Sequence, residues 1–300
     1  MKIIKQNFLL LFAVTMKVIT SEANAQQIKT INSSPLTLTY YNAAESSFGV
    51  TSVLVSGRSD AILIDAQFTF TDAKNVIKEI RKSRKNLKAI FVSYGDPDFY
   101  FGLEVFKKEY PNVPIYATAA TIEHIASTFQ GKLVYWGNIF KDEIPTTVKM
   151  PELLTGSTLN LEGEVISLIT VPNAPARSFI WIPSIKAIVG GINVFGDDFH
   201  LWMADDATAA KRELWIEALN QITALHPAIV IPAHFGKGAN LTITSVEYTK
   251  TYIETYGEDL KTDKNSAALI AHMKTKYPKA TFLTALELGA KVNTGELQWP

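Results

Sequence analysis

Short apolar runs separated by turn residues open the chain and predict antiparallel strands. Residues 36–41 and 49–55 are the first two runs, and a loop containing Gly57 separates the second from the apolar run 61–64. Strands of this length joined by a short glycine-containing loop usually form a hairpin. We therefore expect residues 49–55 to pair with residues 61–64.

The pattern then changes to an alternation of helices and strands. Val76, Ile77 and Ile80 recur at helical spacing after a capping residue at Thr71 or Asp72, which predicts an amphipathic surface helix. The expected elements that follow are a strand at 89–93, a helix at 103–110, a strand at 113–117 and a helix at 121–129. Such an alternation predicts parallel strands joined by right-handed crossovers. His124, on the last of these helices, is interpreted as a surface or core residue.

A second series of strands occupies the middle of the chain. The β-type runs are 153–156, 159–161, 165–171, 179–182 and 187–189, followed by a helix at 207–225, a strand at 228–231 and helices at 246–262, 266–276 and 282–288. Short runs separated by Gly, Pro and Asn turns indicate a largely antiparallel set. Two halves with strands inside and helices outside predict a four-layer αββα sandwich, formed by residues 26–300 as a single domain.

The first 25 residues have the pattern of a secretory signal peptide. Lys2 and Lys5 precede an apolar run at 8–14, and the small-residue sequence Ala-Asn-Ala at 23–25 follows. The run is too short to span a bilayer as a helix. We therefore expect a periplasmic or secreted protein whose mature chain begins at about Gln26 and has no membrane span after cleavage.

Composition excludes several functions. The chain has 29 basic and 29 acidic residues, so its charge gives no reason to expect nucleic acid or an anionic membrane as a partner. The sequence contains no cysteine, so no thiolate acts as a nucleophile or metal ligand. Apolar residues make up 47 % of the chain, which is enough for a large buried core.

Candidate site residues lie where predicted strands end. Asp96 and Asp98 follow the strand 89–93, and His234 follows the strand 228–231. Open α/β sheets place their sites at the carboxyl ends of strands. Two adjacent carboxyl groups can divide acid and base roles, whereas the alternative for Asp98 is a structural one, hydrogen bonding to backbone amides of its turn.

Three segments together resemble the metallo-β-lactamase superfamily. They are SYGDPDFYFG at 93–102, PNAPARSFIWIPSIKAIVGGINV at 172–194 and AIVIPAHFG at 228–236, and the resemblance extends over roughly residues 36–256. It implies the metallo-β-lactamase αββα sandwich. It also implies a hydrolase whose strand-end loops carry one or two zinc ions.

The zinc-binding motif of that family is largely replaced here. Its H-x-H-x-D-H sequence falls on Tyr94, Asp96, Asp98 and Phe99, so only Asp98 matches. The later ligand positions, a histidine, a bridging aspartate and a last histidine, fall on Asn173, Ile192 and His234. A catalytic zinc ordinarily takes three protein ligands, mostly imidazole. We therefore expect no cofactor. Any zinc or other divalent cation would use Asp96, Asp98 and His234.

The expected pocket is lined by aromatic residues. The loop 196–202 covers the site in the family, so His200 and Trp202 are predicted to join Tyr94 and Phe99 there. Apolar pockets with a few polar groups bind small organic molecules. The sequence thus predicts a small-molecule-binding pseudoenzyme with catalytic remnants Asp98 and His234. One alternative is an atypical hydrolase of lactone, ester or β-lactam substrates, and a further one is an envelope scaffold protein.

Overall fold

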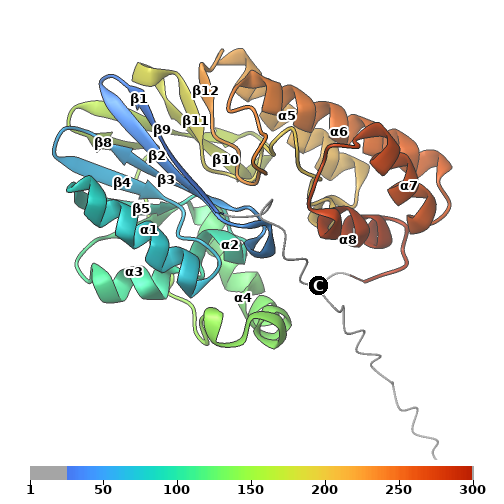
Figure 1. Cartoon of the computed structure of the whole chain (residues 1–300), viewed down its shortest axis with the longest axis horizontal. Helices are drawn as coiled ribbons and strands as arrows, with labels where there is room; N and C mark the ends of the chain where they lie inside the picture. The colour runs from blue at the N-terminus through green and yellow to red at the C-terminus, as the bar shows by residue number, and fades with distance from the viewer. Residues whose placement is uncertain (1–25, 299–300) are drawn as a thin grey trace, which may run out of the picture.

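The two predicted series of strands form two β-sheets that pack face to face. The computed structural model describes residues 26–298, so the predicted signal peptide lies outside the described residues. Helices cover the outer faces of both sheets, with α1 and α3 beside the first and α5 and α6 beside the second (Figure 1). The four-layer αββα sandwich expected from the sequence is confirmed.

The first sheet has seven strands in sequence order. They are β1 Gln27–Ser33, β2 Leu36–Asn42, β3 Thr51–Ser56, β4 Asp60–Ile64, β5 Asn86–Val92, β6 Ile115–Ala117 and β7 Glu152–Leu153. β1 to β4 are antiparallel, and β4 to β7 are parallel. The predicted hairpin is confirmed by the β3–β4 pairing, in which Val53 faces Ile64. β1 was not predicted, because it is an edge strand that is mostly exposed and carries few apolar residues.

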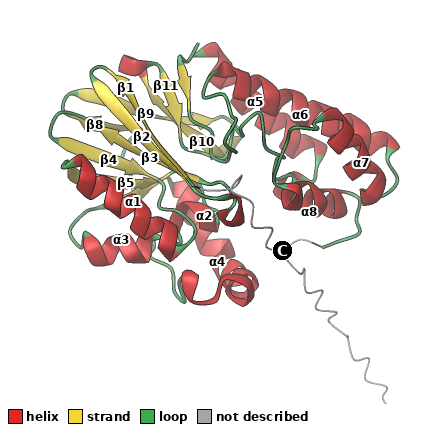
Figure 2. Ribbon diagram, viewed as in Figure 1, coloured by secondary structure: helices red, strands yellow, loops and turns green. Residues whose placement is uncertain are grey.

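The second sheet has five strands and is largely antiparallel, as expected. They are β8 Thr158–Leu161, β9 Glu164–Val171, β10 Ala174–Ile182, β11 Ala187–Val189 and β12 Ile229–Val230. Only the β11–β12 pair is parallel. The second sheet lies behind β1 to β5 in the view of Figure 2.

The helices lie close to their predicted positions. The α-helices are α1 Phe70–Ser83, α2 Pro97–Tyr100, α3 Leu103–Glu109, α4 Ala119–Phe140, α5 Ala209–Ala224, α6 Ile243–Thr262, α7 Ser266–Lys276 and α8 Leu283–Asn293. Short 3-10 turns are η2 Glu45–Ser47, η3 Lys141–Glu143, η4 Pro183–Ile185 and η5 Ala204–Asp206. The predicted helix 121–129 is only the first part of α4, which continues through Gly131 and Gly137. No helix within residues 26–298 is long and apolar enough to cross a membrane.

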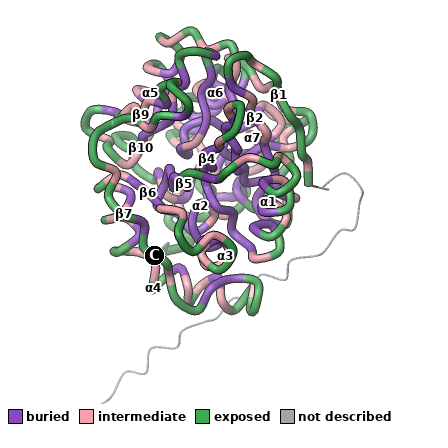
Figure 3. The backbone as a smooth tube through the Cα atoms, turned by 90° about the vertical axis from the view of Figure 1, so that its left-hand side faces the viewer, coloured by how far each residue is buried: buried purple, intermediate pink, exposed green. Residues whose placement is uncertain are grey.

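The core divides at the first sheet, because successive side chains of a strand point to opposite faces. On β5, Ala89 and Phe91 face the second sheet, whereas Ile90 and Val92 face the helical layer. Figure 3 shows this buried interior around β4 and β5. α1 buries Val76, Ile77 and Ile80 against the sheet, which confirms its predicted amphipathic character.

A buried hydrogen-bonded link joins the two sheets at their site end. The backbone amide and hydroxyl of Ser93 both donate to the carboxylate of Asp65, at 2.7 and 2.6 Å. The amide of Gly191, which follows β11, donates to the Ser93 hydroxyl at 2.7 Å. Complete burial raises the pKa of Asp65 to about 8, although both Ser93 bonds oppose this rise. The link fixes the ends of β4 and β5 relative to the loop after β11.

We expect Ser93→Ala to lower the free energy of unfolding by about 2 kcal/mol, because it leaves buried polar groups of Asp65 and Gly191 without a partner. Urea unfolding measures the effect. Ser157→Ala removes the same atom from an exposed serine and should change stability by less than about 0.5 kcal/mol. Equal stability of the two variants would contradict a structural role for this link.

Candidate functional site

The turn after β5 places two carboxylates at the mouth of the first sheet. Asp96 occupies the N-cap position of α2, and Pro97 follows as its first residue, where its missing N–H is harmless. The carbonyl oxygen of Asp96 accepts a bond from the amide of Phe99, and the Phe99 carbonyl accepts one from Ala66. The local sequence therefore fixes Asp96 and Asp98 on one rigid turn.

Asp96 and Asp98 open into a small cavity of about 40 Å³. A water molecule needs about 10–15 Å³ measured this way, so the cavity has room for two or three waters. Its lining combines five aromatic side chains with five titratable ones. The lining residues are Phe48, Phe68, Asp96, Pro97, Asp98, Lys132, Trp136, Ile192, Trp202, Asp205, His234 and Phe282. We call this the strand-end cavity.

His234 is held at both ring nitrogens by the chain itself. Its Nε2 lies 3.2 Å from Oδ2 of Asp98, and its Nδ1 lies 3.0 Å from the carbonyl oxygen of Phe48. The ring stacks on Phe195 and meets the edge of Phe99. The backbone of His234 forms bridges to Val50 and Phe195, which fixes the position of the imidazole.

Phe48 is the centre of the aromatic part of the lining, which we call the aromatic wall: Phe48, Phe68, Trp136, Trp202 and Phe282. Its ring makes edge-to-face contacts with Phe68, Trp136, Trp202 and Phe282. Its backbone has φ of 65°, in the left-handed region that non-glycine residues avoid. The same residue thus supplies both an aromatic ring to the cavity and the carbonyl oxygen that orients His234.

Lys132 brings a positive charge into the strand-end cavity from α4. Its side chain is only 10 % exposed, and its ammonium lies 3.6 Å from Oδ1 of Asp96. Burial lowers the pKa of Lys132, but the carboxylates of Asp96, Asp205 and Asp98 outweigh burial and raise it above its ordinary value. Burial also raises the pKa of Asp96, and the attraction of Lys132 only partly opposes this.

The η5 turn supplies the remaining charged groups. The indole nitrogen of Trp202 donates to Oδ2 of Asp205 at 2.7 Å. Asp206 points away to a buried ion pair with Arg177, whose guanidinium lies 2.6 Å from the carboxylate and stacks over Trp215. Of these two neighbouring acids, only Asp205 lines the strand-end cavity.

The structure brings together most, but not all, of the site residues expected from the sequence. Asp96, Asp98, Ile192, Trp202 and His234 line the cavity. Tyr94 and Phe99, which were also expected to line the pocket, are buried edge to face with each other and do not line the cavity. Burial raises the pKa of Tyr94 well above its ordinary value.

Two expected residues lie elsewhere. Asn173 is exposed at the β9–β10 turn and does not line the cavity. His200 is buried against α6, where its Nδ1 lies 3.0 Å from the Tyr252 hydroxyl and burial lowers its pKa to about 4. The loop that contains it approaches the cavity with Trp202 instead.

Several residues of this region were not among the predicted site residues. Lys132, Asp205 and Phe48 line the cavity, and Nε2 of His124 lies 3.9 Å from Oδ1 of Asp96. Burial lowers the pKa of His124, and Lys132 lowers it further. One signal was present for Lys132: it is the one charged residue in the apolar sequence FQGKLVYWGNIF that ends α4.

The residues of the strand-end cavity do not fit a zinc ion. Phe99 and Ile192 offer no ligand atom, and Asn173 is outside the cavity. A zinc site needs several histidine, aspartate or glutamate ligand atoms close together. Within residues 26–298, only Asp259, Asp263 and His272 form a group of at least three such residues with all ligand atoms within 4.8 Å of one another. That group lies on α6 and α7, away from the cavity, and Asp259 is already paired with Lys276 at 2.6 Å.

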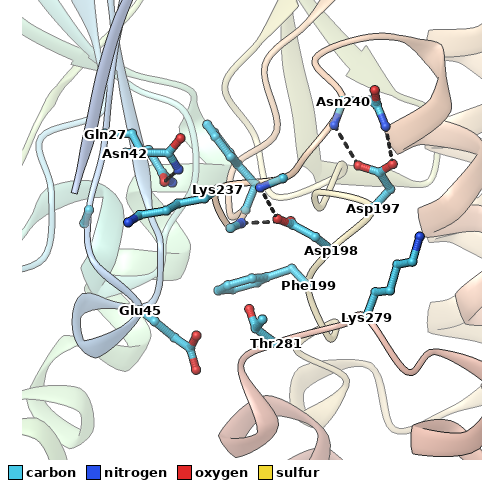
Figure 4. A pocket seen from close by; sticks show the side chains of 14 residues that line it. Gln27, Asn42, Glu45, Asp197, Asp198, Phe199, Lys237, Asn240, Lys279 and Thr281 are labelled. Carbon is cyan, nitrogen blue, oxygen red and sulfur yellow. Dashed lines mark hydrogen bonds between the residues drawn. The ribbon is translucent and has the colours of Figure 1, made fainter. Parts of the chain in front are cut away.

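A larger polar cavity of about 420 Å³ lies beside the loops 197–199 and 235–240 (Figure 4). Its carboxylates are used to fasten these loops. Asp198 accepts bonds from the amides of Gly236 and Gly238, and Asp197 accepts bonds from both the backbone and the side chain of Asn240. These acids therefore have structural partners.

The ion pair of Lys132 and Asp96 makes stability depend on pH. A carboxyl group with a raised pKa in the folded state contributes stability at low pH, where both states are protonated, and loses it as the pH rises through that pKa. Because the Lys132 ammonium lowers the pKa of Asp96, removing it raises that pKa further. With the pKa of Asp96 at about 8, we expect Lys132→Met to lose about 1 kcal/mol more stability relative to the wild type at pH 9 than at pH 5, measured by urea unfolding. The exposed Lys149→Met serves as the control, and a pH-independent loss would contradict the pairing.

Comparison with known proteins identifies the family. The family model described as the metallo-beta-lactamase superfamily matches residues 47–234. The crystal structure of DIM-1 metallo-β-lactamase has a TM-score of 0.56 and 17 % identity, over 77 % of this chain and 97 % of that one. The metallo-β-lactamase from Pontibacter korlensis has a TM-score of 0.52 and 16 % identity, over 76 % and 99 %. The search of curated proteins gave no match. At 17 % and 16 % identity, the likeness to these two structures concerns the fold. The family model covers more than half of this chain, so the chain belongs to the metallo-β-lactamase superfamily.

Proposed function

We propose that this protein is a zinc-independent member of its superfamily that binds a small molecule at the strand-end cavity and does not hydrolyse it. One observation carries the proposal. The polar residues retained at the family's ligand positions already have partners from the chain, Asp96 with Lys132 and Asp98 with His234. A metal ion at Asp96 would have to displace the Lys132 ammonium, which lies 3.6 Å from its carboxylate.

The geometry of His234 also argues against ordinary hydrolysis. A general base must have a nitrogen available to accept a proton from water. Nδ1 faces the Phe48 carbonyl and Nε2 faces Asp98. His234 can therefore act as a general base only after one of these two contacts breaks. Without a zinc ion, which lowers the pKa of bound water from about 16 to about 7, no group in the cavity generates hydroxide at neutral pH.

The lining defines the expected ligand. A lining that combines aromatic and charged side chains favours a small molecule with an apolar body and a polar or charged end. The cavity of about 40 Å³ admits only a few heavy atoms. A larger ligand requires an aromatic side chain of the lining to move, and Trp202 is the one of these that is only partly buried.

Zinc content tests the proposal. The protein is purified without chelator and then incubated with equimolar zinc. We expect Asp98→Ala and His234→Ala to hold as much zinc as the wild type, because no zinc binds through these two residues. Elemental analysis after desalting gives the stoichiometry. Zinc at the α6–α7 group is recognised separately, because His272→Ala abolishes it. Near-stoichiometric zinc that depends on Asp98 and His234 would overturn the zinc-independent assignment.

An atypical hydrolase is a second candidate, favoured by the 3.2 Å contact between Asp98 and His234. A carboxylate beside an imidazole is part of many hydrolytic sites. A panel of lactones, esters and β-lactams distinguishes the two functions. Turnover that is lost in both Asp98→Ala and His234→Ala, and retained in His226→Ala, would establish hydrolysis and exclude the binding-only role.

We also propose that the protein is exported to the periplasm or secreted. The charged start, the apolar run and the Ala-Asn-Ala sequence at 23–25 support this. We expect the intact mass of the protein recovered from the exported fraction to correspond to a chain that begins at Gln26. Replacing Ala25 by a bulky residue should block the cleavage. An uncleaved chain recovered only from the cytoplasm would contradict export.

A further inference from the structure

We infer that Lys132 is a built-in cation that replaces the metal ion of the superfamily, so that the strand-end cavity is a cage for an ammonium group. The inference rests on the zinc-independent site proposed above. It assigns a binding property to the cavity: when the lysine side chain is truncated, a free alkylammonium ion takes its place.

The carboxylates of the cavity carry the argument. Asp96, Asp98 and Asp205 all line it, and each attracts the Lys132 ammonium. Three acids gathered in a small, largely buried space repel one another and require a positive charge nearby. In the structure the ammonium of Lys132 supplies it, 3.6 Å from Asp96.

The spacing of these groups suits an ammonium better than a bare ion. Ligand atoms of a divalent cation converge to about 2.0–2.6 Å from it. The acids and His234 of the cavity are more widely spread, since they do not form a group with all ligand atoms within 4.8 Å. An ammonium is larger and donates three hydrogen bonds, so it accommodates this spread.

The helix that carries Lys132 explains how the charge reaches the cavity. α4 lies in the connection between β6 and β7, and Lys132 and Trp136 are one turn apart on the same face. Both line the cavity, so the aliphatic stem of the lysine enters beside an aromatic wall. A cation held this way stays with the chain, and it has no open coordination position at which to activate water.

Chemical rescue of Lys132→Ala tests the inference. The substitution removes Cγ, Cδ, Cε and Nζ, and propylammonium has the same heavy atoms. We expect Lys132→Ala to melt at a lower temperature than the wild type, and millimolar propylammonium to restore several degrees of this loss. 1-Propanol, which has the same size and no charge, should not. Wild type and Lys149→Ala should not respond to either compound at that concentration.

Manganese provides an independent probe of the emptied cage. Carboxylate oxygens suit Mn²⁺, and removal of the ammonium removes its repulsion. In a His272→Ala background, we expect Lys132→Ala to bind Mn²⁺ at least about tenfold more tightly than the matched protein with Lys132, by electron paramagnetic resonance. Adding Asp98→Ala should abolish the gain.

The outcomes separate this inference from the proposed function. Equal rescue by 1-propanol would show that Lys132 acts through its apolar stem, and no rescue of a folded variant would show that its charge is not needed. Either result overturns the inference while the protein stays zinc-independent. Zinc bound by the wild type through Asp98 and His234 overturns both. If Lys132→Ala does not fold, refolding with propylammonium but not with 1-propanol supports the inference, and refolding with neither contradicts it.

Discussion

The site depends on the buried link between Asp65, Ser93 and Gly191. It joins the end of β4, the end of β5 and the start of the loop after β11, so it fixes the two sheets relative to each other where their loops meet. The turn with Asp96 and Asp98 begins three residues after Ser93. Ile192 directly follows Gly191. A small shift of this link would therefore move both sides of the strand-end cavity.

Above this link, charge neutralisation determines the chemistry. Three acids, Asp96, Asp98 and Asp205, line the strand-end cavity, whereas Phe99 and Ile192, at positions where the resemblance predicts metal ligands, have no ligand atom. Three ionised acids in this space would give a buried excess of negative charge. The ammonium of Lys132 and the raised pKa of the buried Asp96 together reduce it. Aromatic side chains occupy much of the remaining lining.

The fold could be predicted from the sequence because its elements have strong local patterns. Apolar strands such as β5 alternate with helices such as the amphipathic α1, and acids follow the strand ends. Together these patterns indicate a layered α/β structure with a site at one edge. The content of the site was harder to predict. Lys132 and Phe48 reach the cavity from α4 and from the loop before β3, and His200 turns away to Tyr252. These placements depend on tertiary packing between segments far apart in the sequence, for which a single sequence contains no direct signal.

The left-handed conformation of Phe48 has a wider consequence. A glycine would adopt this φ without cost, whereas phenylalanine stores strain of about 1–3 kcal/mol in the loop. Packing of its ring against five other aromatic residues offsets that strain. Any event that separates these rings also frees the backbone to relax, and relaxation withdraws the carbonyl oxygen from His234. Opening of the aromatic wall and release of the imidazole are thus a single mechanical event, so a ligand that parts the rings also changes the hydrogen bonding of the one histidine in the cavity lining.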